Sequence, residues 1–75
     1  MMTRFIYRVQ ELLAERGEVL NDLQREVGVH RKTLYRGPKR KQTIAAIAYY
    51  LNVNAADLVA GTDAEEIWNR DTSEY

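Results

Sequence analysis

Positive charge is concentrated in one short stretch of this sequence. Six of its eleven basic residues fall between positions 31 and 41, with no acidic residue among them: Arg31, Lys32, Arg36, Lys39, Arg40 and Lys41. Arginine presents a rigid fork of N–H donors that matches a guanine edge or a phosphate, whereas lysine presents a point charge. The net charge of the chain is zero. Charges act over a Debye length of about 8 Å, however, so the local density of positive charge determines which partner this stretch attracts. The stretch therefore favours an anionic partner.

The C-terminal part of the chain has the opposite charge. From position 57 onward Arg70 is the only basic residue, against six acids: Asp57, Asp63, Glu65, Glu66, Asp71 and Glu74. The chain is thus electrically polarised, although its pI is near neutral. We expect the acidic end to avoid phosphate, which leaves it available to a protein partner.

Helices must position the basic residues, because apolar residues recur at helical spacing throughout the chain. The first helix ends before Gly17, and a second, short one ends at Gly28, whose type suits a left-handed cap. A third spans roughly residues 31–36 and stops at Gly37-Pro38. We predict an all-α fold of five helices with a short additional C-terminal helix. One domain over 1–75 is expected, with a core at about 5–60 and an extension at 61–75.

The order of elements between residues 23 and 34 predicts a helix-turn-helix. A short apolar helix carries Leu23 and Val27, a Gly28-Val29 turn follows, and the next helix has Leu34 as its one strongly apolar residue. If Leu34 points inward, four neighbours three or four positions apart share the outer side: Arg31, Lys32, Tyr35 and Arg36. A helix fits the major groove of B-DNA, so we predict that these four side chains read base edges.

Contacts to the phosphate backbone are expected beside that helix. We predict a basic loop over residues 39–42, followed by a helix capped by Thr43, whose N-terminus would offer amide donors to phosphate. His30 is expected at the N-cap of the helix that carries Leu34. The predicted phosphate-binding set, which would contribute affinity without sequence information, is His30, Lys39, Arg40, Lys41 and Thr43.

The predicted C-terminal helix carries two large apolar residues with two equally weighted interpretations. Asn54 is expected to cap the fifth helix, and residues 62–65, Thr-Asp-Ala-Glu, read as a capping box that opens the sixth. Ile67 and Trp68 share one side of this last helix. They either enlarge a thin core or form a contact with a second copy of the chain or another protein, since large aromatic residues anchor interfaces.

An ordered set of residues over about 5–60 resembles the lambda-repressor-like family, also called the Cro/C1 or XRE type. The carrying positions are Leu12-Leu13, Gly17, Leu23, Val27-Gly28-Val29, Thr33-Leu34, Ile47-Ala48, Leu51-Asn52-Val53 and Asp57-Leu58. The resemblance implies five helices, a recognition helix at 31–36, and regulation of transcription, often by a dimer on a palindromic operator. The chain departs from the family's usual pattern at Val19-Leu20, Gln24 and Gly37-Pro38.

Other function classes have little support in the composition. The chain has no cysteine and one histidine, and it shows no acid–base pair, nucleophile relay or phosphate-cradling glycine loop. We therefore expect no enzyme activity, cofactor or metal, no membrane span, and a cytoplasmic, nucleoid-associated protein. The prediction is sequence-specific binding of double-stranded DNA by a repressor-type transcription regulator. The alternative is a protein-interaction module or antitoxin-like adaptor with weak DNA binding, and single-stranded RNA binding is a weaker third option.

Overall fold

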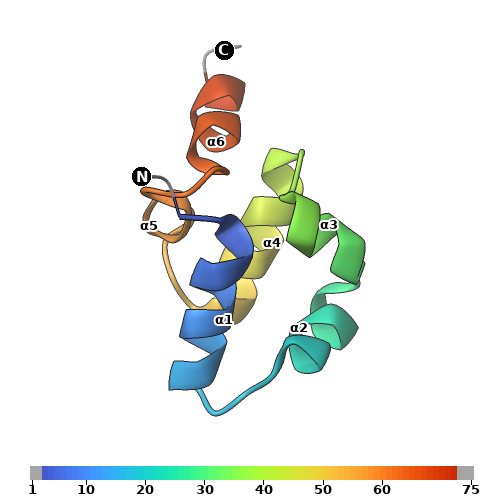
Figure 1. The fold of residues 1–75 in the computed structure, drawn as a ribbon. Helices are drawn as coiled ribbons and strands as arrows, with labels where there is room; N and C mark the ends of the chain where they lie inside the picture. Colours follow the sequence, from blue (N-terminus) through green and yellow to red (C-terminus); the bar gives the residue numbers. More distant parts are fainter. Residues whose placement is uncertain (1–2, 73–75) are drawn as a thin grey trace.

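The computed structural model describes the backbone of residues 3–72 and the side chains of residues 3–70. The chain forms six helices in this range: α1 (Phe5–Glu15), α2 (Leu20–Val27), α3 (Arg31–Arg36), α4 (Lys41–Leu51), α5 (Ala55–Val59) and α6 (Glu65–Thr72). In Figure 1, α1 stands in front of α4, with α2 and α3 on one side and α5 and α6 toward the other. The predicted all-α fold, five helices with a short additional one, is confirmed.

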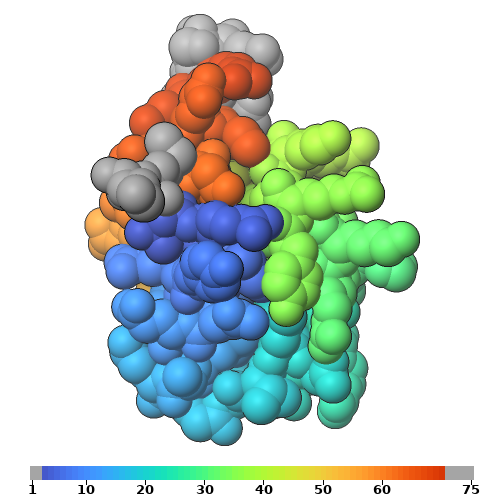
Figure 2. Space-filling model, viewed as in Figure 1, coloured from blue at the N-terminus to red at the C-terminus, as the bar shows by residue number. Residues whose placement is uncertain are grey.

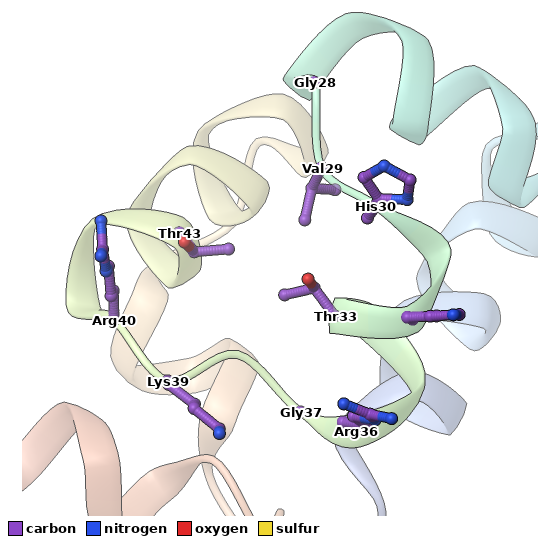
Figure 3. Close-up of a pocket in the computed structure, with 10 residues that line it drawn as sticks. Gly28, Val29, His30, Thr33, Arg36, Gly37, Lys39, Arg40 and Thr43 are labelled. Atoms are coloured by element: carbon purple, nitrogen blue, oxygen red, sulfur yellow. The ribbon is translucent and has the colours of Figure 1, made fainter.

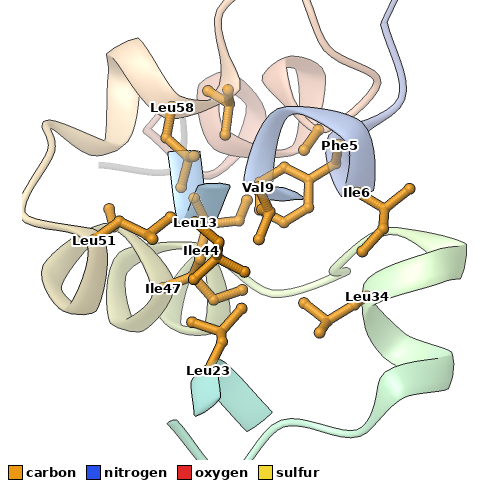
Figure 4. Close-up of a cluster of buried hydrophobic side chains, with 13 residues drawn as sticks. Phe5, Ile6, Val9, Leu13, Leu23, Leu34, Ile44, Ile47, Leu51 and Leu58 are labelled. Atoms are coloured by element: carbon orange, nitrogen blue, oxygen red, sulfur yellow. The ribbon is translucent and has the colours of Figure 1, made fainter. Parts of the chain in front are cut away.

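One cluster of buried apolar side chains joins these helices (Figure 4). Val9 of α1, Leu23 of α2, Leu34 of α3, and Ile44 and Ile47 of α4 are each 0% exposed. Leu34 is the only buried residue of α3, so α3 is held to the protein body chiefly by this side chain. The burial of Leu34, on which the helix-turn-helix prediction depended, is confirmed.

The turn between α2 and α3 has the expected geometry. Gly28 adopts a left-handed conformation, with φ of 75°, and its N–H donates to the carbonyl of Gln24. A residue with a Cβ would be strained at this φ, which explains the glycine. His30 occupies the N-cap of α3, where its carbonyl accepts from the Leu34 N–H at 3.2 Å. Its imidazole makes no capping hydrogen bond, so the histidine marks the helix start through its backbone alone.

The predicted start of the fourth helix was wrong by three residues. Arg40, not Thr43, is the N-cap of α4, with an extended backbone and a carbonyl that accepts from the N–H groups of Thr43 and Ile44. Lys41 and Gln42 therefore lie in the first turn of α4 and not in a basic loop. Because the Thr43 amide is bonded within the helix, it is not a donor for a phosphate. Pro38, predicted only as a terminator of α3, is also fully buried.

The segment before α6 is held against the N-terminus of α1. Thr3 and Thr62 form an isolated parallel bridge, in which the Thr3 N–H donates to the Gly61 carbonyl at 3.0 Å. The Asp63 carboxylate accepts a hydrogen bond from the Phe5 N–H at 2.9 Å, where α1 has no capping side chain of its own. The residue that caps α1 thus lies 58 positions away in the sequence.

The predicted capping box at residues 62–65 is also corrected. Thr62 is buried, and its hydroxyl donates to the Val59 carbonyl at 2.7 Å and accepts from the Ala64 N–H at 3.2 Å. The Glu65 N–H bonds to the Thr62 carbonyl instead of the hydroxyl. Thr62 therefore serves the end of α5 and the turn, and buried Ala64 extends the core past residue 60.

Replacing Asp63 by alanine is expected to lower the free energy of unfolding by about 1 kcal/mol, because the Phe5 N–H would lose its acceptor at the positive end of α1. Asp63→Asn is the matched control, since it keeps an oxygen at the same position and should lose less. Urea unfolding followed by circular dichroism would measure both changes. Wild-type midpoints for both variants would show that this long-range cap contributes nothing.

A second polar contact ties the α1–α2 turn to α4. The Tyr50 hydroxyl donates to the Glu18 carboxylate, and the Arg16 guanidinium bonds to Glu18 and lies 5.3 Å from the centroid of the Tyr50 ring. The hydrogen bond to Glu18 raises the pKa of Tyr50 to about 12, and the same bond, with that from Arg16, lowers the pKa of Glu18. This contact holds the start of α2 against α4, and α2 in turn supports the turn before α3.

Candidate nucleic-acid interface

The exposed side of α3 carries the side chains predicted to read bases. Arg31, Lys32, Tyr35 and Arg36 are all exposed, while Leu34 between them is buried. In Figure 2 the side chains of the segment coloured green to yellow-green project from one edge of the molecule. The arrangement follows from helical spacing, because a helix with one buried position must present the positions on its far side to solvent.

Arg31 is held in place by a residue that the sequence analysis missed. Its guanidinium donates to the Asn21 side-chain oxygen of α2 at 3.1 Å. This bond leaves other N–H donors of the guanidinium available to a ligand. The signal that could have identified Asn21 was a polar residue in the first turn of the helix before the turn, ten positions ahead of Arg31.

A groove of about 490 Å³ separates α3 from the start of α4 (Figure 3). In Figure 3, Thr33 of α3 and Thr43 of α4 point toward one another across it. Its ionisable and hydroxyl-bearing lining residues are His30, Lys32, Thr33, Arg36, Lys39, Arg40 and Thr43. Two predicted base readers and four predicted phosphate contacts are therefore brought to one basic groove, and no acidic residue is among its lining.

Lys41 is the member of the predicted phosphate set that does not line this groove. Its ammonium lies 4.7 Å from the centroid of the Trp68 ring of α6, a cation–π contact. Trp68 and Ile67 are partly buried and pack against the core cluster. The structure thus joins two residues that the sequence analysis had assigned to different roles, one to phosphate and one to the core or a partner.

Tyr35 and Arg31 lie outside the lining of the groove, at opposite ends of the same helix. The Tyr35 carbonyl accepts a hydrogen bond from the Arg4 guanidinium at 2.6 Å. Tyr35 is 42% exposed, so the residue remains accessible to a ligand. The exposed surface of α3 therefore continues beyond the groove, with a cation at Arg31 and an aromatic residue at Tyr35.

Comparison with known protein families places the chain in one of them. A family model described as a Cro/C1-type HTH DNA-binding domain matches residues 8–63. The match includes α2, the turn, α3 and the whole basic groove. The chain belongs to this family. No curated protein and no solved structure matches the chain at a significant level.

Membership in the Cro/C1-type family means that the chain is a helix-turn-helix DNA-binding domain, and α3 is the second helix of the motif formed by α2 and α3. The resemblance inferred from the sequence is thereby confirmed. Domains of this family typically have no catalytic activity. The match ends before α6 and begins after Arg4, so the Arg4–Tyr35 hydrogen bond and the Lys41–Trp68 contact each include a residue outside it.

Two further observations concern the described residues only. No group of three or more His, Asp or Glu side chains among them is arranged to hold a metal ion. Every helix within residues 3–72 is too short or too polar to cross a membrane. Of the acidic C-terminal residues, the side chain of Asp71 and all of Glu74 lie outside the described part of the chain.

Proposed function

We propose that this Cro/C1-type domain binds double-stranded DNA sequence-specifically and acts as a repressor-type transcription regulator. We place it in the cytoplasm, in association with the nucleoid. The observation that carries the proposal is the cationic outer side of α3, which stands beside a basic groove while Leu34 is buried beneath it. A bound domain excludes other proteins from the duplex that it covers, which makes repression the effect that binding alone provides.

Base reading is assigned to Arg31, Lys32, Tyr35 and Arg36. An arginine that donates two hydrogen bonds to O6 and N7 of guanine discriminates against other bases. Arg31 is suited to this role, because its bond to Asn21 limits the orientations of the guanidinium before DNA arrives. Preorganisation of this kind reduces the entropy lost on binding.

Phosphate contacts are assigned to His30, Lys39, Arg40, Lys41 and Thr43. The groove brings four of these residues to the ends of two helices, where the backbone of a duplex docked on α3 would pass. In the structure, Lys41 contacts Trp68. The Lys41 ammonium must therefore leave the Trp68 ring before it can bind a phosphate. We therefore expect Lys41 to contribute less than Lys39 or Arg40.

We also propose that the domain binds as a homodimer or with a protein partner through its C-terminal end. A dimer would place two recognition helices on half-sites about 34–36 Å apart, one turn of the duplex. Support for this end comes from α6, whose exposed residues include Glu65 and Glu66, because acidic residues keep it from phosphate. Ile67 and Trp68, half-buried on the core, are the candidate anchors of that contact.

Selection from a random duplex library, followed by fluorescence anisotropy, tests the function directly. Arg31→Ala and Arg36→Ala are each expected to relax preference at one base pair, at a cost of about 1–3 kcal/mol if the contact is bidentate. Arg8→Ala is the control, because this arginine lies on α1, outside the groove, and bonds to the Asp57 carbonyl at 3.4 Å. It should leave both affinity and preference unchanged.

The same titrations separate the proposal from its alternative. If the wild-type protein binds no duplex with measurable salt dependence, the chain is better described as a protein-interaction module or antitoxin-like adaptor that retains the fold. If duplex binding is retained but Arg31→Ala and Arg36→Ala leave base preference intact, the base-reading assignment is wrong. A selected site with two halves at a fixed spacing would support the dimer.

A further inference from the structure

The C-terminal end of α3 lacks the backbone cap that other helices of this chain have. Helix ends leave the last carbonyls without intrahelical partners. The chain following α1, α2 and α4 returns N–H donors to such carbonyls, as Glu18 does to Leu13, Gly28 to Gln24 and Val53 to Ala48. After α3 comes Gly37, whose backbone leads away from the helix, and then Pro38, which has no N–H. The last carbonyls of this short helix are therefore left to side-chain donors or to water.

Arg4, in the N-terminal segment, supplies such a donor to the end of α3. Its Nη2 lies 2.6 Å from the Tyr35 carbonyl oxygen, across 31 positions of sequence. A hydrogen bond from a charged donor is shorter and stronger than a neutral one, and a cation is favourable at the negative end of a helix. The guanidinium also lies 6.0 Å from the Tyr7 ring centroid, which limits its movement further.

The backbone that carries Arg4 is itself anchored. Thr3 is paired with the segment around Thr62 on one side of Arg4, and the Phe5 N–H is bonded to Asp63 on the other. Arg4 is also the N-cap of α1, so its position follows that of α1. The guanidinium therefore joins the end of α3 to a firmly held part of the body.

We propose that Arg4 is a positioning residue for DNA recognition, which caps α3 and fixes the direction of the side chains in its last turn. This inference rests on the proposed function, in which Tyr35 and Arg36 face the duplex. Arg4 lies outside the residues that the family model matches, so the contact is a property of this chain's own N-terminal segment.

Loss of the cap has a consequence limited to one end of the recognition helix. Without Arg4 the last turn of α3 frays more readily, and a bidentate contact by Arg36 needs a defined side-chain direction. We expect discrimination at the base pair read by Arg36 to fall about two- to fivefold, the size of effect typical of a cation at a helix C-terminus. Arg31 is held independently by Asn21 at the other end, so preference there should persist.

The test compares Arg4→Gln with Arg8→Gln, using the full chain and the duplex obtained by selection. Arg8 lies on α1, whose N-cap is Arg4, but it bonds to the Asp57 carbonyl, on α5, at 3.4 Å, so it controls for the loss of a nearby arginine. Competition anisotropy against every single-base variant of the site gives a profile of preference along the duplex, at a temperature where each variant is folded. Arg4→Lys, which retains the charge, should restore part of the profile.

A second measurement tests, in the absence of DNA, whether Arg4 caps the end of α3. Hydrogen exchange at the amides of Tyr35 and Arg36 should be faster in Arg4→Gln than in wild type or Arg8→Gln, while exchange in α4 stays unchanged. Unchanged exchange in α3 would overturn the proposal. So would a uniform loss of affinity at all positions, which would make Arg4 a phosphate contact. If wild type binds no duplex, the proposed function fails, and exchange alone decides whether Arg4 orders α3.

Discussion

Replacing Leu34 by alanine is expected to cost about 2–5 kcal/mol of unfolding free energy, the range for truncating a fully buried leucine. The side chain is 0% exposed and is the only buried residue of α3. The loss therefore falls on a six-residue helix that cannot persist alone. Because the free energy of unfolding of native proteins is only about 5–15 kcal/mol, this substitution removes a large part of it.

Two variants of the same helix make this prediction specific. Leu34→Met, which conserves volume, should cost less than about 1.5 kcal/mol. Tyr35→Ala removes an exposed neighbour and should change stability far less than Leu34→Ala. Urea unfolding can be followed by circular dichroism and by the fluorescence of Trp68, the single tryptophan. A cost below about 1 kcal/mol for Leu34→Ala would show that α3 is held by something other than this side chain.

Replacing Lys39 and Arg40 together by glutamine is expected to reduce affinity for every duplex alike, by about 60-fold at 0.1 M salt. Each phosphate contact contributes about 0.9 to the slope of log K against log salt, so two lost contacts flatten that slope by about 1.8. Both residues line the groove beside α3, and neither lies on the recognition helix, so base preference should not change.

The control for this pair removes the same charge elsewhere. Arg8→Gln with Arg70→Gln also lowers the net charge by two but alters α1 and α6, away from the lining of the groove. Its salt slope should stay near that of wild type. If both double variants flatten the slope equally, the binding depends on net charge and not on the groove. A change of base preference in the Lys39 and Arg40 variant would show that at least one of these two residues contacts bases and not only phosphates.

The sequence alone determined the helices and the side of α3 that faces outward. Apolar residues at helical spacing, a glycine suited to φ of 75° at position 28, and a lone Leu34 among cations leave one arrangement that buries the apolar residues together. Local rules were less reliable at helix starts. Thr43 is a good N-cap residue by type, yet Arg40, two positions after the buried Pro38, is the N-cap, although its side chain makes no capping hydrogen bond.

Tertiary structure alone decided which polar groups meet. Arg31 with Asn21, Arg4 with Tyr35, Asp63 with Phe5, and Lys41 with Trp68 are pairs that the packing of the helices brings together. Their partners lie 10 to 58 positions apart, and no periodicity links them. Periodicity reports which side of a helix is buried, because burial acts on every turn. A single hydrogen bond depends on the packing of whole helices, so it becomes visible only once the chain has folded.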